Sequence, residues 1–201
     1  MSDNVLVTTA YLPPVSYFSL LSAYSSVIIE KEENYTKQTY RNRCYIMSAN
    51  GTTFLTVPVF LGSFHKTAVK DIRIDYSRRW QQVHLGALES SYRSSPFFLY
   101  YFDDLSKIVL NNYTFLLDLN QNLLDFMIST LGIKAKLSYS ESFEPVKNEL
   151  NDYRYKITPK KNDTGTYRQY VQVFSSRFGF VPGLSIVDLL FNMGPDSREY
   201  L

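Results

Sequence analysis

The 201-residue chain contains very little cysteine, histidine and tryptophan: one cysteine, two histidines and one tryptophan. A single cysteine, Cys44, excludes a disulfide within the chain and any zinc site built from several cysteines. The two histidines, His65 and His84, belong to no His-x-x-x-His or His-x-Glu pattern, which argues against a zinc hydrolase. We therefore expect no metal site in this protein.

The chain has neither a large net charge nor an extended apolar stretch. The formal net charge is +2, and basic and acidic residues alternate along the chain, whereas nucleic-acid-binding domains usually carry a clustered basic stripe. No apolar run reaches the roughly 20 residues that span a bilayer, and the first residues do not resemble a secretory signal. We expect a cytoplasmic protein that neither binds nucleic acid nor spans a membrane.

Several enzyme motifs are absent as well. The chain has no Gly-x-Ser-x-Gly motif, no P-loop and no Gly-x-Gly-x-x-Gly, so a serine hydrolase, a P-loop kinase and a standard dinucleotide-dependent oxidoreductase are poorly supported. We expect no bound cofactor.

Hydrophobic residues make up 45% of the chain, which is enough for a core in one domain covering residues 1–201. Residues 5–7 and 27–30 have the character of buried strands. Between them, Pro13 and Pro14 end the first strand and precede a helical pattern. This order predicts a compact βαβ unit.

A β-hairpin is expected next, over residues 43–58. Asn50-Gly51 favours a type I′ turn, because both central residues of that turn need a positive φ. A turn at this position pairs Cys44 with Val57 on an apolar face, which we assign to the core.

Three apolar stripes at helical spacing then predict a layer of helices from residue 77 to residue 131. Ser77, Ser95 and Thr114 are the expected N-terminal caps, and Gly132 is the expected stop. The fold class is therefore α/β: a single domain with a small, partly parallel sheet, an N-terminal βαβ unit, an added hairpin and a layer of helices.

The last third of the chain has less regular patterns. Residues 141–165 are polar and contain prolines and a glycine, a composition typical of a mobile loop. Residues 167–174 have strand character, and the segment from Leu184 predicts a short helix. Ser185 and Asp188 at its start form a capping box, with Ser185 accepting from the Asp188 amide.

Two polar segments each follow a strand of the βαβ unit. The carboxyl ends of strands form the usual ligand edge of an α/β sheet, and arginine makes bidentate bonds to phosphate. Tyrosines there can stack on a ring or bond a sugar hydroxyl. An ordinary solvated rim remains the alternative. The candidate substrate-binding residues are Tyr11, Tyr17, Tyr40, Arg41, Asn42 and Arg43.

His84 is the candidate catalytic residue, because it lies on an apolar stripe one turn after Trp80. It is either a proton carrier at a pocket wall or a core histidine bonded to the backbone. His65 lies in a connection and has the pattern of a solvated residue. Cys44 falls on the apolar hairpin face, which suits an inert thiol.

Four blocks of the sequence resemble the WbqC-like protein family. They are YLPPVSYFSLL, YRNRCYIMSANGTTFLTVPV, DYSRRWQQVHLGALESSYRSSPFF and FGFVPGLSIVDLLFNMGP, in that order along the chain. The resemblance implies a link to bacterial O-antigen and surface-polysaccharide gene clusters.

These observations lead to a functional hypothesis. We expect a protein of surface-polysaccharide biosynthesis that binds a small anionic metabolite such as a nucleotide-activated sugar. If it is an enzyme, the expected reaction is group transfer to an activated amino sugar. The alternative is a non-catalytic interaction protein that uses a surface rich in tyrosine and arginine. A homo-oligomer remains open.

Overall fold

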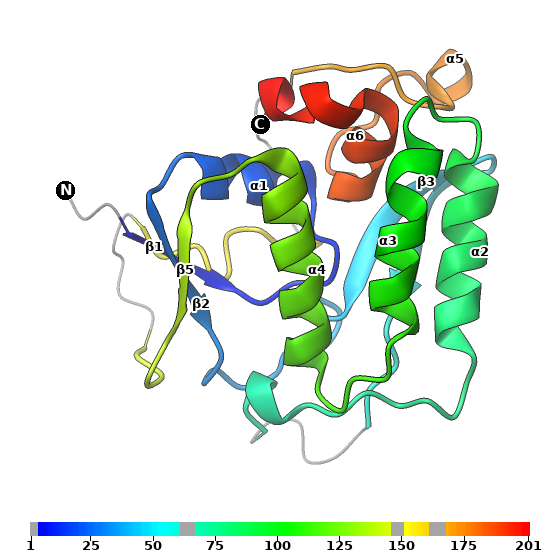
Figure 1. The fold of residues 1–201 in the computed structure, drawn as a ribbon. Coiled ribbons are helices and arrows are strands. Elements are labelled where there is room, and N and C mark those ends of the chain that lie inside the picture. The colour runs from blue at the N-terminus through cyan, green and yellow to red at the C-terminus, as the bar shows by residue number, and fades with distance from the viewer. Residues whose placement is uncertain (1–3, 61–66, 146–150, 161–167) are drawn as a thin grey trace.

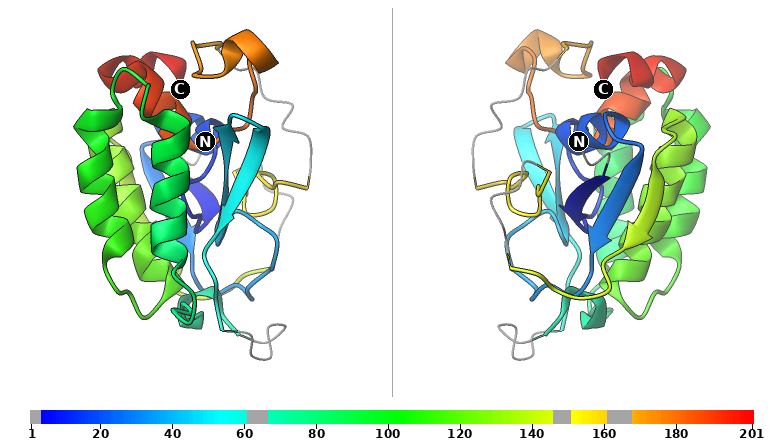
Figure 2. Two further views of the ribbon diagram at one scale, coloured as in Figure 1. Left: turned by 90° about the vertical axis from the view of Figure 1, so that its right-hand side faces the viewer. Right: turned by 90° about the vertical axis from the view of Figure 1, so that its left-hand side faces the viewer.

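Three parallel strands form a sheet at one side of the fold, at the left in Figure 1 and facing the viewer in the right-hand view of Figure 2. The computed structural model describes residues 4–60, 67–145, 151–160 and 168–201. The strands are β1 (Asn4–Thr8), β2 (Ser26–Glu30) and β5 (Lys136–Tyr139), and β2 lies between the other two. A single α/β domain with a small parallel sheet is confirmed.

The N-terminal βαβ unit is also confirmed. Helix α1 (Val15–Ser22) joins β1 to β2, and Pro14 stands directly before its first residue. Proline suits this position because it lacks the N–H that a helix start leaves unbonded. Tyr17, Phe18 and Leu21 of α1 are buried in the core.

The hairpin consists of β3 (Arg43–Ser48) and β4 (Gly51–Thr56). Its predicted register is wrong, because Cys44 pairs with Leu55 rather than with Val57. The connection uses residues 49–50, so Gly51 with its positive φ of 107° already pairs in the ladder. A shift of two residues preserves the faces of a strand, and Cys44 is buried as expected.

Helices α2 (Trp80–Tyr92), α3 (Phe98–Leu110) and α4 (Leu116–Leu131) lie side by side as one layer (Figure 1). The three expected serine and threonine caps are wrong, because none of these helices has a side-chain cap hydrogen bond. Gly132 ends α4 in the left-handed conformation, as predicted.

Shorter elements complete the chain: η2 (Val69–Asp71), α5 (Ser175–Phe178), α6 (Ile186–Met193) and η3 (Gly194–Tyr200). Residues 168–174 form no strand, contrary to the prediction. Ser185 does cap α6, but its side chain accepts from the Val187 amide instead of the Asp188 amide. The Asp188 carboxylate turns inward and accepts from Tyr170 Oη at 2.7 Å.

The described part of the expected mobile loop contacts β1. The Leu6 amide donates to the Asn151 carbonyl oxygen at 3.0 Å, and the Tyr153 amide donates to the Leu6 carbonyl oxygen at 2.8 Å. Residues 146–150 and 161–165 of that loop lie outside the described residues, so its mobility stays a prediction. Among the described helices, none has the length and apolarity needed to cross a membrane.

Candidate functional site

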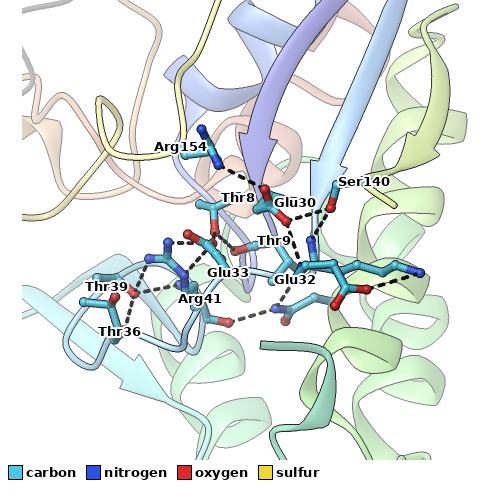
Figure 3. Close-up of polar contacts among 12 residues, drawn as sticks. Thr8, Thr9, Glu30, Glu32, Glu33, Thr36, Thr39, Arg41, Ser140 and Arg154 are labelled. Atoms are coloured by element: carbon cyan, nitrogen blue, oxygen red, sulfur yellow. Dashed lines mark hydrogen bonds and ion pairs between the residues drawn. The ribbon is translucent and has the colours of Figure 1, made fainter. Parts of the chain in front are cut away.

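The carboxyl ends of the parallel strands meet at one edge of the sheet, where buried charged and polar side chains gather (Figure 3). Thr8 ends β1 and Glu30 ends β2, and the chain after β2 continues to Glu33 along this edge. Ligands of open α/β sheets usually bind at such an edge. The geometry of these side chains therefore decides what the edge offers to a ligand.

An ion pair between Glu33 and Arg41 anchors the segment that follows β2. The Arg41 Nε and Nη2 atoms donate to Glu33 Oε1 at 2.9 and 2.6 Å, and Nη1 donates to Thr39 Oγ1 at 3.2 Å. Both charged side chains are almost completely buried. Thr8 Oγ1 donates to the same Glu33 oxygen. This pair thus ties residues 34–42 to the end of β1.

A second buried ion cluster lies beside the first. Arg154 Nη1 donates to Glu30 Oε2 at 3.0 Å, and Nη2 donates to Asp152 Oδ2 at 2.6 Å. The other Glu30 oxygen accepts from Ser140 Oγ at 2.7 Å. Hydrogen bonds from Arg154 hold the pKa of Asp152 below its ordinary value, against the effect of burial. Because its carboxylates are bonded by their own neighbours, this cluster fastens residues 152–154 to the edge.

The predicted residues Tyr17 and Arg41 come together through Thr8. Tyr17 Oη donates to the Thr8 carbonyl oxygen at 2.9 Å. Thr8 Oγ1 in turn donates to Glu33, the carboxylate that pairs with Arg41. Tyr17 and Arg41 are each 2% exposed. The two polar segments therefore meet, but these side chains bond to the protein in this conformation. Their contact with a ligand stays a prediction.

His84 and Tyr11 form a buried pair. His84 Nε2 lies 3.2 Å from the Thr56 carbonyl oxygen, which can only accept, so Nε2 carries the proton. Nδ1 then accepts from Tyr11 Oη at 2.9 Å. Burial lowers the pKa of His84 to about 4, so the ring is neutral at pH 7. This arrangement is that of a core histidine, and the role of His84 as a proton carrier stays a prediction.

The remaining predicted residues, Tyr40, Asn42 and Arg43, lead into the hairpin. Tyr40 packs edge-on against Tyr45 and is buried. Asn42 Nδ2 donates to the Val57 carbonyl oxygen at 2.9 Å. Arg43 is only half-buried, and its guanidinium lies 4.5 Å from the centre of the Phe54 ring.

A surface cavity of about 560 Å³, which we call the basic cavity, opens beside this segment. Asn42 and Arg43 line it, whereas Tyr11, Tyr17, Tyr40, Arg41 and His84 do not. Among the described residues, the charged side chains that line it are Lys37, Arg43, Asp75 and Arg78.

The segment of residues 34–42 thus has two faces. One face carries Arg41 into the buried ion pair, and the other carries Lys37 and Asn42 to the wall of the basic cavity. Tyr35 also lines the basic cavity: burial raises its pKa to about 12, and the nearby charges of Arg41 and Arg43 oppose that rise. The buried pair therefore fixes the backbone from which the cavity residues project.

Sequence reasoning missed Lys37 and Arg78 at the cavity and Glu30, Glu33 and Arg154 at the sheet edge. Lys37 and Arg78 lie in stretches of mixed polar residues that are typical of a solvated surface. The two glutamates could have been found only from their positions at or just after the end of a strand. Arg154 belongs to the polar loop, and no sequence pattern around it indicates a buried charge. His65 lies outside the described residues. Within the described ranges, no group of three or more His, Cys, Asp or Glu side chains is placed to hold a metal ion.

The fold and this edge define an α/β protein with buried ion pairs at the carboxyl ends of its strands and a basic cavity beside them. Comparison with known proteins identifies its family. The WbqC-like protein family matches residues 9–167, and the chain belongs to this family. It is 31% identical over 231 aligned residues to "Uncharacterized protein Rv1507c" of Mycobacterium tuberculosis (strain ATCC 25618 / H37Rv), covering 100% of this chain and 98% of that relative. No solved structure matches the chain.

Proposed function

We propose that this WbqC-like protein binds a small anionic metabolite, such as a nucleotide-activated sugar, in the basic cavity. One observation carries the proposal: among the described residues that line the cavity, Lys37, Arg43 and Arg78 are accompanied by one carboxylate, Asp75. Arginine and lysine are the side chains that recognise phosphate. A volume of about 560 Å³ lies within the range of small-molecule sites.

The hydrogen bonding of these cations supports the proposal. Lys37 and Arg78 form no ion pair within 4 Å of a described residue; hydrogen bonds from Ser77 lower the pKa of Asp75, and the nearby charge of Arg78 lowers it further. Among the described residues, the Arg43 side chain donates one hydrogen bond, from Nε to Thr56 Oγ1 at 3.2 Å, and its guanidinium faces the Phe54 ring. Their donors are thus available to an anion. The arginines of the sheet edge are different, because Arg41 and Arg154 are already neutralised by carboxylates.

The proposal places the protein in the cytoplasm, within surface-polysaccharide biosynthesis, where nucleotide-activated sugars are handled. Group transfer to an amino sugar is a further step, and it would depend on His84 as the proton carrier. Since His84 bonds to Tyr11 and to the backbone, ligand binding has the more direct support. A non-catalytic partner surface has less support, because the rings of Tyr11, Tyr17, Tyr35 and Tyr40 are buried.

Calorimetric titration with UDP- and dTDP-sugars tests the proposal. We expect wild-type protein to bind at least one of them, and Arg78→Gln to weaken that binding about tenfold or more, because a charged hydrogen bond is lost. Arg79→Gln is the matched control, since Arg79 is also exposed and adjacent but does not line the cavity. An absence of binding at millimolar concentration, or equal losses in the two variants, would refute the proposal.

A further inference from the structure

A second cavity, of about 430 Å³, adjoins the basic cavity. The two share Phe60, Asp75 and Ser77 as lining residues. We call the second one the aromatic cavity, because three aromatic residues, Phe60, Tyr76 and Tyr113, are among its lining residues. One ligand that enters the basic cavity can therefore extend past Phe60 into the aromatic cavity.

The aromatic rings at this junction are exposed although they are large and apolar. Phe60 is 57% exposed and Tyr76 is 36% exposed. Aromatic side chains usually bury most of their surface, because they gain more from burial than smaller residues. Exposed rings that line a concavity are a common feature of ligand sites.

Hydrogen bonds anchor the Tyr76 side chain and the backbone of Phe60. Tyr76 Oη donates to the Tyr113 carbonyl oxygen at 3.0 Å, and the Tyr76 ring lies 6.0 Å from the Trp80 ring. The Phe60 amide donates to the Arg73 carbonyl oxygen at 3.0 Å. The Tyr76 ring is thus held in place and the backbone at Phe60 is anchored, which lowers the ordering cost when a ligand stacks there.

A cationic side chain also lines the aromatic cavity. Arg73 lines it and is exposed, and its side chain makes no hydrogen bond or ion pair with the described residues. A planar ring that carries carbonyl or ring-nitrogen acceptors would find stacking partners and a donor here. A sugar phosphate alone would leave these groups unused.

We propose that the aromatic cavity is a subsite for the planar base of a nucleoside diphosphate whose phosphates occupy the basic cavity. This inference rests on the proposed function and adds which part of the ligand each cavity takes. Stacking of a base on an aromatic side chain strengthens binding by about five- to 150-fold and tolerates different bases. The base should therefore add at least about fivefold to the affinity of the phosphates alone.

The experiment compares pyrophosphate with UDP and ADP by calorimetric titration on wild-type protein, Phe60→Ala and Tyr100→Ala. Phe60→Ala removes the ring shared by the two cavities, while Tyr100→Ala removes a 76% exposed ring on α3 that lines neither. We expect UDP or ADP to bind wild type at least about fivefold more tightly than pyrophosphate. Phe60→Ala should lose most of that advantage and keep its affinity for pyrophosphate, whereas Tyr100→Ala should match wild type.

The outcomes separate the two proposals. If pyrophosphate, UDP and ADP bind wild type equally, the base subsite is refuted while the anion site stands. The base subsite is also refuted, and the anion site stands, if Phe60→Ala and Tyr100→Ala have equal effects on the ratio of nucleotide affinity to pyrophosphate affinity. If none of the three ligands binds, the anion site and the base subsite both fall.

Discussion

Replacement of Arg41 by methionine tests the buried ion pair that anchors residues 34–42. The substitution keeps a side chain of similar length but removes the charge that balances Glu33. Glu33 is 0% exposed, and Arg41 supplies two of the donors to its Oε1 atom. Removing one partner of a buried pair typically costs about 3–5 kcal/mol, because the other charge stays buried without compensation.

The magnitude is large enough for ordinary unfolding measurements. For a chain of about this size, 1 kcal/mol corresponds to about 2–4 °C in the midpoint of thermal unfolding, so Arg41→Met should lower Tm by about 6–20 °C. Urea titration at pH 7 should give the same loss in free energy of unfolding, with little change in its slope.

Two further variants make the test specific. Arg43→Met removes a half-exposed arginine two residues away and should cost less than about 1 kcal/mol of stability. Glu33→Gln combined with Arg41→Met should be more stable than Arg41→Met alone, because no unpaired charge remains. A loss below about 1 kcal/mol for Arg41→Met, or a double variant that is the least stable, would refute the role given to this pair.

Other predictions concern the rest of the core. The pKa of His84 is lowered from 6.5 to about 4, so below pH 6.5 the unfolded chain takes up a proton that the folded chain does not. The free energy of unfolding should therefore fall by about 3 kcal/mol between pH 6.5 and pH 4, and urea titrations of His84→Gln should lack this component. At Gly194, whose φ is +54°, a Cβ would overlap the Phe97 ring, so Gly194→Ala should lower stability by about 1–3 kcal/mol. Gly86→Ala has open space in α2 and should raise stability by up to about 1 kcal/mol; thermal unfolding that ranks the two alanine variants the other way would contradict this. Burial raises the pKa of Cys44, so a thiol reagent should modify it only in denaturant, and rapid modification of folded protein would count against its burial.

Local patterns were enough to predict the βαβ unit and the hairpin faces. The apolar alternation around Cys44 identifies the buried face, since a strand repeats every two residues. The register was wrong because the turn lies at residues 49–50, one residue before the Asn50-Gly51 pair suggested by turn preference. Of the strand expected at residues 167–174, the described residues 168–174 form none, because strand character alone supplies no neighbour with which to pair.

The candidate site was only partly accessible to sequence reasoning. The arginine-rich segment and the first loop do meet at the carboxyl edge of the sheet, as strand order predicts. Which face each arginine takes depends on partners that are distant in sequence or unmarked by any motif. Arg41 turns inward to Glu33, while Arg154 reaches Glu30 from a position 124 residues away. Such pairings follow from the tertiary fold, so no local pattern reveals them.

The most direct test of the proposed ligand site is a crystal structure of the protein with UDP. We predict that phosphate oxygens lie within hydrogen-bond distance of Arg43 and Arg78 in the basic cavity, with the Glu33–Arg41 pair intact beneath. Phosphates bound elsewhere on the molecule, or bound to Arg41 after the buried pair has separated, would contradict it.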